Sequence, residues 1–550
     1  MHVRQGWRYG LVLVTVGVAL SALGNERAIS AQADDAGAAG RVRAHMEFLA
    51  DDLLEGREAG TRGYDVAAKY VASVLQTYDF EPAGSSDTFF QPVPLLESRL
   101  TQSELSIAPK SGASVTLDLP TDAVVVPDHL RATSEVTAPL VYAGFGVTAP
   151  EQNYDDYADL NVRGKVVLLL TNAPKQLPSE PRAHYASLQQ KVKNATERGA
   201  VGVLLTALPS DQKRFPWDRV VQIAGEPQMA WIDAQGKPAN QYPELRGRAL
   251  LGPTGATKLF AHSPTPLDEV HAAGESGKPR GFELPVTVTI RTRTAHEKTT
   301  SPNVVGVLKG SDPELATSYV VLTAHLDHTG VGPAVKGDTI YNGAYDNAAG
   351  CAILLEVART IAQAPERPRR SVLITFVTAE EKGLLGSDYF ARNPTVPQEA
   401  IVANVNLDMP ILQWPLAEVV AFGAENSSLG AVVQQAVKAG GLTLAPDPLP
   451  EENLFVRSDQ YSLVKQGVPA VYLMPGFTSK DPQKDGGEIL GRFLATHYHQ
   501  PSDDLSLPID LEAVAAFTQA NYLIAIAIAN DTTAPTWKPG NFFGEQFGRP

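Results

Sequence analysis

The chain has 550 residues, of which 43% are hydrophobic and 19% are charged, and its formal net charge is −15 at pH 7. A chain of this length exceeds one ordinary hydrophobic core, so we expect more than one domain. The negative charge argues against a nucleic-acid-binding surface and is compatible with an exported enzyme.

The N-terminus has the pattern of a secretory signal peptide. Arg4 and Arg8 precede an apolar run from Leu11 to Leu23. This run is shorter than the about 20 residues that span a bilayer. Ala31-Gln32-Ala33 is a candidate cleavage site. We therefore expect residues 1–33 to be removed, leaving a periplasmic or secreted protein without a stable membrane anchor; the alternative is an uncleaved anchor.

After the signal, residues 41–78 carry apolar side chains at helical spacing on both sides of GREAGTRG (residues 56–63). This pattern predicts two helices joined by a glycine-rich loop. From residue 132 the sequence pattern changes, and it now predicts short apolar strands, LVYAGFGVTAP, GKVVLLLTN and AVGVLLTAL, with one helix at 187–198. Pro- and Gly-rich loops separate them, which predicts a compact β-rich unit that closes near residue 262.

Beyond residue 262, short apolar β runs alternate with helical stretches at 349–363, 427–439 and 510–529. Strands alternating with helices predict an α/β fold, with a mixed central sheet flanked by helices. Residues 34–131 cannot easily close a core alone but can complete this sheet. We therefore predict one α/β domain made of residues 34–131 and 263–550, with residues 132–262 inserted in it and the tail, 531–550, lying over it.

The single cysteine, Cys351, excludes an intramolecular disulfide. It lies in the apolar helical run GCAILLEVARTIAQ, so we expect a buried core thiol and not a nucleophile. His184, His262 and His271 lie apart from the motifs discussed next, and we expect them at the surface.

Polar clusters follow several predicted strands at their carboxyl ends, where open α/β sheets bind ligands. YVVLTA ends in His325-Leu326-Asp327-His328, SVLITFVTA in Glu380-Glu381, and IVANVNL in Asp408. The loop NGAYDNAAG carries Asp346 and the segment ATHYHQPSDD carries His499. A single strand-end carboxylate is usually a helix cap or solvated, but five such clusters after separate elements predict a shared site.

Two histidines and three carboxylates suit a borderline divalent ion such as zinc. Five protein ligands exceed one catalytic zinc ion, which keeps a position for water, but they suit two ions if one carboxylate bridges. Adjacent Glu380 and Glu381 would point in different directions, so that one can ligate while the other acts as general base.

The pieces AHLDH, GAYDNAAG, AEEKGLLGS, NLDM and YHQPSDD, in this order, resemble the M28 family of zinc-dependent aminopeptidases. The resemblance covers about residues 280–530 and the N-terminal helices, and it implies the zinc-exopeptidase fold (phosphorylase/hydrolase-like). Residues 132–262 resemble the protease-associated (PA) domain that many members carry as an insertion.

The resemblance implies a role for each motif residue and two Zn²⁺ ions as cofactors. His325 and Asp408 would bind one ion, Glu381 and His499 the other, and Asp346 would bridge them. Glu380 would take a proton from the bridging water and pass it to the leaving amine. Asp327 would accept an N–H from a ligand imidazole, and Tyr498 would hydrogen-bond the developing oxyanion, with core packing as the alternative for this residue. His328 would form the pocket wall or lie at the surface.

The implied function is removal of N-terminal amino acids from peptides that have a free N-terminus. The family often has histidine where Gln460 stands, so pocket specificity does not carry over. Carboxypeptidase or dipeptidase action by the same site remains an alternative, and the direction of Arg457 bears on it. A receptor-like homologue without catalysis and a glutaminyl cyclase are further alternatives. The sequence leaves the oligomeric state open.

Overall fold

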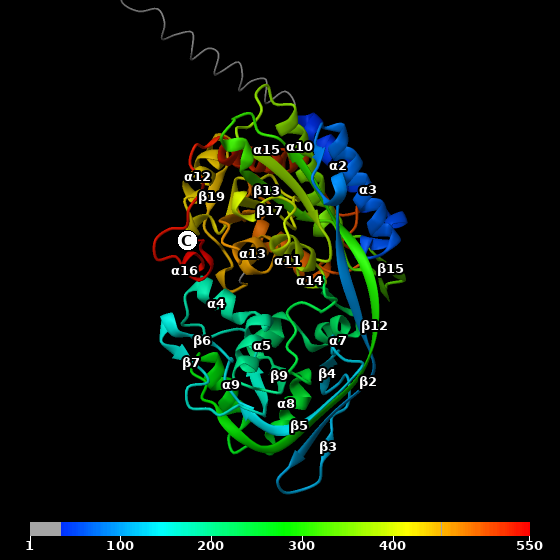
Figure 1. The fold of residues 1–550 in the computed structure, drawn as a ribbon, viewed down its shortest axis with the longest axis vertical. Coiled ribbons are helices and arrows are strands. Elements are labelled where there is room, and N and C mark those ends of the chain that lie inside the picture. The colour runs from blue at the N-terminus through cyan, green and yellow to red at the C-terminus, as the bar shows by residue number, and fades with distance from the viewer. Residues whose placement is uncertain (1–34, 453, 550) are drawn as a thin grey trace, which may run out of the picture.

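The structure, a computed structural model, describes residues 35–452 and 454–549. The predicted signal peptide, residues 1–33, lies outside the described residues. Figure 1 shows two halves stacked along the long axis. The upper half holds the N-terminal helices and most of the C-terminal region. The lower half is built mainly from elements between β3 and α9.

The predicted helices on either side of GREAGTRG are confirmed as α2 (Asp35–Leu49) and α3 (Arg62–Thr77). Thr61 caps α3, because its side chain accepts a hydrogen bond from the backbone N–H of Tyr64. The glycine-rich loop between the helices contains a short 3-10 turn, η1 (Asp52–Arg57), and packs against the β14–β15 hairpin.

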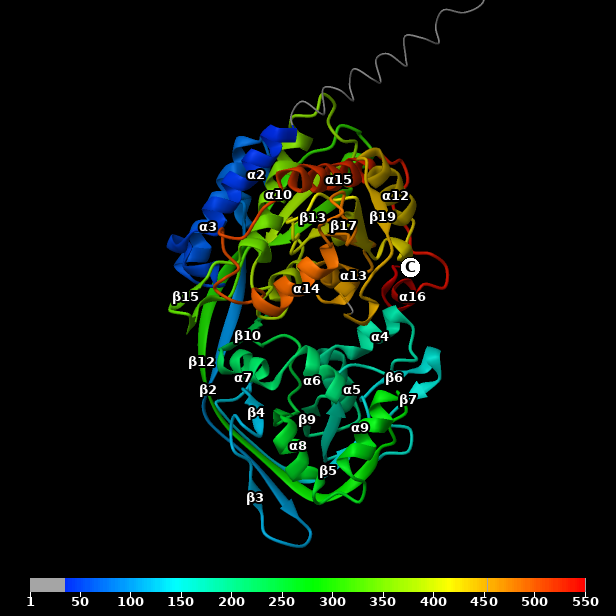
Figure 2. The same ribbon diagram turned by 180° about the vertical axis from the view of Figure 1, so that it is seen from behind.

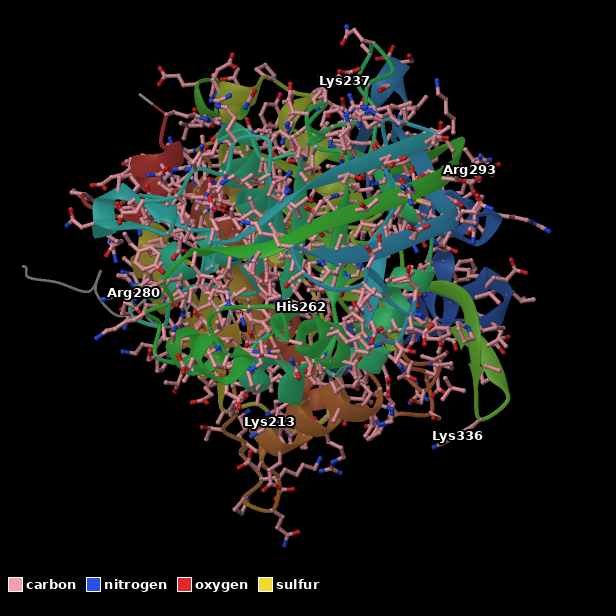
Figure 3. The ribbon with its side chains drawn as sticks, turned by 90° about the horizontal axis from the view of Figure 1, so that it is seen from below. Lys213, Lys237, His262, Arg280, Arg293 and Lys336 are labelled. Atoms are coloured by element: carbon pink, nitrogen blue, oxygen red, sulfur yellow. The ribbon has the colours of Figure 1, made fainter. Side chains whose placement is uncertain are left out.

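Parallel strands form the centre of the upper half, in the order β20, β17, β13 and β16. Every residue of β16 is buried, as expected for a strand covered on both faces. The strands of this half are β13 (Tyr319–His325), β14 (Gly330–Val335), β15 (Asp338–Tyr341), β16 (Ser371–Val377), β17 (Ile401–Leu407), β18 (Glu418–Phe422), β19 (Thr443–Ala445) and β20 (Ala470–Pro475). Lys336 marks the tip of the β14–β15 hairpin, which projects from the body (Figure 3).

Helices cover both faces of this sheet, so the predicted layers are observed. One face carries α2, α10 and α15, which pack against one another, and its core includes the buried thiol of Cys351. The other face carries α11 and α13. The helices are α10 (Ala349–Ala362), α11 (Leu385–Arg392), α12 (Leu429–Ala439), α13 (Gln460–Val464), α14 (Gly486–Thr496), α15 (Leu511–Asn530) and α16 (Phe542–Phe547).

Among the described residues, one helix, α15, has the length and composition of a membrane-spanning segment. In the structure this helix packs against α2, α10 and α12, and its Phe517 and Ile524 are fully buried in the main core. Its apolar character is therefore explained by packing within the fold.

The lower half has its own strands and helices around a parallel centre of β5, β8, β9 and β11. Its strands are β3 (Val115–Thr116), β4 (Ala123–Val126), β5 (Thr133–Tyr142), β6 (Thr148–Ala149), β7 (Tyr154–Asp155), β8 (Val166–Leu170), β9 (Gly202–Thr206), β10 (Gln228–Trp231) and β11 (Arg248–Leu251). Its helices are α4 (Ser179–Ala186), α5 (Leu188–Glu197), α6 (Pro209–Arg214), α7 (Trp217–Gly225), α8 (Pro253–Phe260) and α9 (Leu267–Glu275).

Two long antiparallel strands, β2 (Phe90–Pro109) and β12 (Phe282–Leu308), run through both halves (Figures 1 and 2). The upper end of β12 pairs with β16, and its lower part pairs with β5. The two runs VTVTIRTRT and NVVGVLKG therefore lie on one strand, although the polar residues between them break the alternating pattern. The short strand β1 (Glu81–Pro82) also pairs with β12.

The predicted limits of the insert, residues 132 and 262, stay a prediction. Elements on both sides of these limits pair with the lower half. The strand β4 precedes residue 132 and pairs with β11, while Phe282–Arg293 of β12 pairs with β5.

The tail lies over the upper half, as predicted. The indole N–H of Trp537 donates to the carbonyl of Gly467 at 3.1 Å, and Phe543 is fully buried. The tail also contacts the lower half, because the ring of Phe542 lies 5.5 Å from that of His184.

The expectation that His184 lies at the surface is wrong. Its ring is buried, and Nδ1 lies 2.5 Å from the hydroxyl of Tyr461. Helix α4 faces the upper half, so a histidine on it is covered by α13 and α16, which no local pattern reveals. His262, labelled in Figure 3, and His271 are partly exposed.

Candidate metal centre

Three neighbouring parallel strands deliver candidate ligands to one edge of the sheet. His325 is the last residue of β13, Asp408 follows β17, and Glu380 and Glu381 follow β16. Since β13 lies between β17 and β16, these side chains meet at the carboxyl ends of the strands.

Two further segments bring Asp346 and His499 to the same place. Asp346 lies in the turn Ala344–Ala348 before α10, and His499 follows α14. Nε2 of His325 lies 3.0 Å from Oδ1 of Asp408 and 3.2 Å from Oδ1 of Asp346. Nε2 of His499 lies 3.0 Å from Oε2 of Glu381 and 3.3 Å from Oδ2 of Asp346. The two oxygens of Asp346 thus face different imidazoles.

We name His325 with Asp408 the strand side of the site, and His499 with Glu381 the loop side; Asp346 belongs to both. The structure therefore brings together all five residues that the sequence assigns as ligands. The candidate donor atoms of His325, Asp346 and Glu381 lie within 4.8 Å of one another.

The donor set fits a divalent metal such as zinc. Ligand atoms that lie about 2.0 Å from a tetrahedral zinc ion are about 3.3 Å apart, close to the separations given above. Nδ1 of His325 lies 3.1 Å from the backbone carbonyl of Asp327. Because a carbonyl only accepts, this nitrogen carries a proton, which leaves Nε2 as the atom that would bind a metal ion.

The predicted contact of the Asp327 carboxylate with an imidazole N–H is not observed. The chain turns after β13, so the carbonyl of Asp327, and not its carboxylate, lies against His325. The carboxylate instead accepts the backbone N–H groups of Glu380 and Glu381 at 3.1 and 3.2 Å. Burial raises the pKa of Asp327 to about 6. This buried residue fixes the backbone that carries the two glutamates.

Glu380 has the electrostatic setting of a group that can hold a proton. Burial raises its pKa well above the usual range, the carboxylates of Glu381 and Asp408 add to this effect, and His325 opposes it. Such a shift suits a general base that must also act as an acid.

His328 is not a surface residue, contrary to one of the two expectations for it. Its ring is fully buried, and Nδ1 lies 2.7 Å from Oε1 of Glu381. The ring also lies 5.7 Å from that of His499. Gly343 makes room for it, since a Cβ at that position would lie 2.5 Å from Cγ of His328. His328 thus supports the loop side of the site.

Two more polar residues, for which no role is predicted from the sequence, support the candidate ligands. Asp503 accepts the backbone N–H groups of Tyr345 at 2.9 Å and Asp346 at 3.0 Å, and burial raises its pKa to about 7. The hydroxyl of Ser458 donates to Oδ2 of Asp408 at 2.6 Å. Asp503 lies in the motif YHQPSDD, so the sequence marks this region, but it does not indicate which groups Asp503 contacts.

Arg57 is a buried arginine that ties the N-terminal loop to the site. Its guanidinium donates to the carbonyl of Asn342 at 2.6 Å, of Leu326 at 3.0 Å and of Gly343 at 3.1 Å, and also to that of Leu49. Its charge lies near Asp327 and other carboxylates of the site. The glycine-rich loop thus contributes to the architecture of the site.

Tyr498 lies beside the loop side, with its ring centre 3.9 Å from that of His499. Burial raises the pKa of its hydroxyl well above the usual range, and nearby Asp346 and Glu381 add to the effect. Gln460 is buried; it stands where the M28 family, which the motifs resemble, often has histidine. Its side chain accepts from Asn406 at 2.9 Å and donates to the carbonyl of Phe455 at 2.7 Å. Arg457 is half-exposed and faces Glu452.

Residues 303–525 match the model of Peptidase family M28, and residues 136–235 match that of the PA domain. A probable leucine aminopeptidase 2 of Aspergillus fumigatus is 26% identical over 255 residues, which are 43% of this chain and 48% of that protein. Aminopeptidase Y of Saccharomyces cerevisiae is 26% identical over 211 residues, 37% of this chain and 34% of that protein. The matched stretches span less than half of the length of these two relatives.

The solved structure of an aminopeptidase from Aneurinibacillus sp. strain AM-1 is similar to this one, with a TM-score of 0.50 and 18% sequence identity. The alignment covers 91% of this chain and 94% of that chain. This likeness shows the fold, and it confirms the predicted mixed α/β sheet flanked by helices. The two matched families are those that the sequence motifs resemble.

Proposed function

Because this chain belongs to peptidase family M28, with a PA domain ahead of the matched region, we propose that it is a zinc-dependent aminopeptidase that uses two ions. The observation that carries the proposal is the position of Asp346, whose two oxygens each face one imidazole at 3.2 and 3.3 Å. Each imidazole is paired with one further carboxylate. This arrangement suits two adjacent ions that share one bridging carboxylate.

His325 and Asp408 would hold one ion, and His499 and Glu381 the other. Zinc at these positions would polarise the scissile carbonyl and lower the pKa of a bound water. Glu380 would take a proton from the attacking water and hand it to the leaving amine, a role that its raised pKa supports. Tyr498 would donate its hydroxyl hydrogen to the developing oxyanion.

The substitution Glu380→Gln tests the catalytic role. It removes proton transfer and leaves all five ligands, so kcat on aminoacyl anilides should fall about 10²- to 10⁴-fold while the zinc content stays at that of the wild type. Steady-state kinetics and metal analysis of the same preparations measure both. A Glu380→Gln variant with wild-type kcat would falsify the role of this glutamate.

A peptide panel tests which end of the substrate is cut. We expect peptides with a free N-terminus to be cleaved whether or not the C-terminus is amidated, and N-acetylated peptides to resist. Cleavage that requires a free C-terminus and tolerates N-acetylation would instead support the carboxypeptidase alternative, and a requirement for both free ends would support a dipeptidase.

Export is part of the proposal and rests on the signal-like N-terminus alone. Expression of the full chain in a bacterial host, followed by N-terminal sequencing of the periplasmic fraction, tests it. We expect the mature protein to begin near Asp34. A full-length chain retained in the membrane fraction would favour the uncleaved anchor.

A further inference from the structure

Helix α7 belongs to the lower half of the molecule but faces the candidate metal centre. It is anchored in the lower half through Trp217, whose indole N–H donates to the carbonyl of Pro120 at 3.1 Å. Figure 2 shows α7 at the boundary between the halves, on the side of α14. Two side chains from this short segment reach across the boundary to residues that adjoin candidate ligands in the sequence.

Arg219 is the first of these side chains. Its guanidinium donates to the backbone carbonyl of Tyr498 and makes a longer contact, 3.5 Å, with the carbonyl of Leu494. The guanidinium carbon also lies 5.2 Å from the centre of the Tyr498 ring. The carbonyl that Arg219 binds belongs to the peptide group that joins Tyr498 to the candidate ligand His499.

This peptide group precedes a residue with an unfavourable backbone conformation. His499 has φ +54°, in the left-handed region that non-glycine residues seldom adopt. Such a conformation persists only where surrounding contacts hold it. The contacts here include the side-chain amide of Gln500, whose Nε2 donates to the carbonyl of His499 at 2.8 Å, and Arg219, which donates to the preceding carbonyl.

Glu226 is the second side chain that crosses the boundary. It follows α7 directly, and its Oε2 lies 3.3 Å from Nζ of Lys382 in an ion pair. Oε1 of Glu58 lies 2.9 Å from the same nitrogen. The side chain of Lys382 is only 6% exposed, and Lys382 follows the candidate ligand Glu381. Arg219 and Glu226 are two helical turns apart, so they lie on one face of the segment.

We propose that α7 positions the loop side of the metal centre, and that Arg219 is a positioning residue for His499. This inference rests on the proposed function, because it concerns the ion that His499 and Glu381 would share. Arg219 holds the peptide before His499, and Glu226 holds the residue after Glu381. The strand side has no such contact with α7 among the described residues, so its ion should not depend on Arg219.

The test is the zinc affinity of the full chain, measured for each ion by chelator competition. Arg219→Ala should weaken the loop-side ion, identified as the one that His499→Ala loses, about 10- to 100-fold, the usual cost of losing a group that orients a ligand, and leave the other ion unchanged. Arg219→Lys keeps one donor near the Tyr498 carbonyl and should recover most of the affinity. It also keeps the proposal testable if Arg219→Ala fails to fold.

Arg214→Ala is the matched control. Arg214 also crosses from the lower half, with Nη1 2.9 Å from Oε1 of Glu452, and its two ion-pair partners, Glu452 and Asp211, lie outside the ligand-bearing loops. Its loss should leave both affinities unchanged. Equal affinities in Arg219→Ala and wild type, or equal weakening of both ions, would overturn the positioning role. A wild-type protein that binds fewer than two zinc ions would instead overturn the proposed function, so the two failures are distinguishable.

Discussion

The two sides of the candidate metal centre are built in different ways. On the strand side, His325 ends a regular strand and its side chain is only 1% exposed. On the loop side, the side chain of His499 is 22% exposed and its backbone has φ +54°. The strand side takes its geometry from the hydrogen bonds of the sheet. The loop side depends on side chains from several segments, including one from the lower half.

This difference predicts which of the two ions is removed first. A ligand at the end of a parallel strand is held by backbone bonds that also hold the core, so it moves only when the sheet moves. A ligand in a loop is held by individual contacts with His328 and Arg219, each of which can be lost alone. We therefore expect the loop-side ion to bind more weakly and to be removed first.

The largest effect should come from the residue that both sides share. Asp346→Ala removes one oxygen from each side, so both zinc affinities should fall by more than about 100-fold and peptidase activity should be lost. Metal analysis after dialysis measures this. Asp338→Ala, at an exposed position on the β14–β15 hairpin, is the control. Full retention of one ion by Asp346→Ala would show that this carboxylate does not bridge.

A matched pair of histidine variants should separate the two sides. His499→Ala should lose one zinc ion and keep the other, and His325→Ala should lose the complementary one. In chelator titrations of the wild type we expect two steps. The easily removed ion should be absent from His499→Ala, and the tightly held ion from His325→Ala. The reverse assignment would contradict the comparison of the two sides.

The sequence predicted that the candidate ligands would lie together, because their positions follow from local rules. His325 and Asp408 end apolar runs, and the carboxyl ends of parallel strands must meet at one edge. The contacts of Arg219 could not be predicted in this way, because its partner, Tyr498, lies in the other half of the molecule. Whether the carbonyl or the carboxylate of Asp327 contacts the imidazole of His325 depends on the turn after β13. The spacing of apolar residues in the sequence does not predict the shape of this turn.

The fold shows the same division between local and long-range information. Helices with helical apolar spacing, such as α10 and α15, were predicted to within about two residues at each end. The sequence predicts two strands where the structure has the single strand β12, because the polar residues in its middle, which pair with β2, interrupt the apolar alternation. His184 was misplaced for a related reason, since its burial depends on α13 and α16.

Arg57 offers a test of how firmly the strand side is tied to the fold. It donates to the carbonyls of Leu326 and Gly343, which neighbour His325 and the Asp346 turn. Arg57→Met leaves several buried carbonyls without a donor, so the free energy of unfolding of the metal-free protein should fall by about 3–5 kcal/mol. Urea denaturation measures it. Arg62→Met, at an exposed position that begins α3, should change it little. Equal stability of the two variants would mean that Arg57 contributes little to the fold.

The smallest expected effect is the pH response of the junction between the halves. Burial lowers the pKa of His184 from 6.5 to about 4, and nearby Lys465 adds to the effect. Between these pH values the unfolded chain binds a proton that the folded chain excludes. The free energy of unfolding should therefore fall as the pH drops from 6.5 to 4, by about 3 kcal/mol from this residue at most, and this contribution should level off below pH 4.

The substitution His184→Gln should flatten this part of the pH profile, and His262→Gln, at a partly exposed position, should not. Urea denaturation of the metal-free protein at several pH values measures both, and removing the metal keeps ligand protonation from adding to the slope. His184 contacts Tyr461 of the upper half and the tail residue Phe542, so its protonation would act where the halves meet. If His184→Gln and wild type show the same slope, the protonation of His184 does not contribute to the stability of the junction.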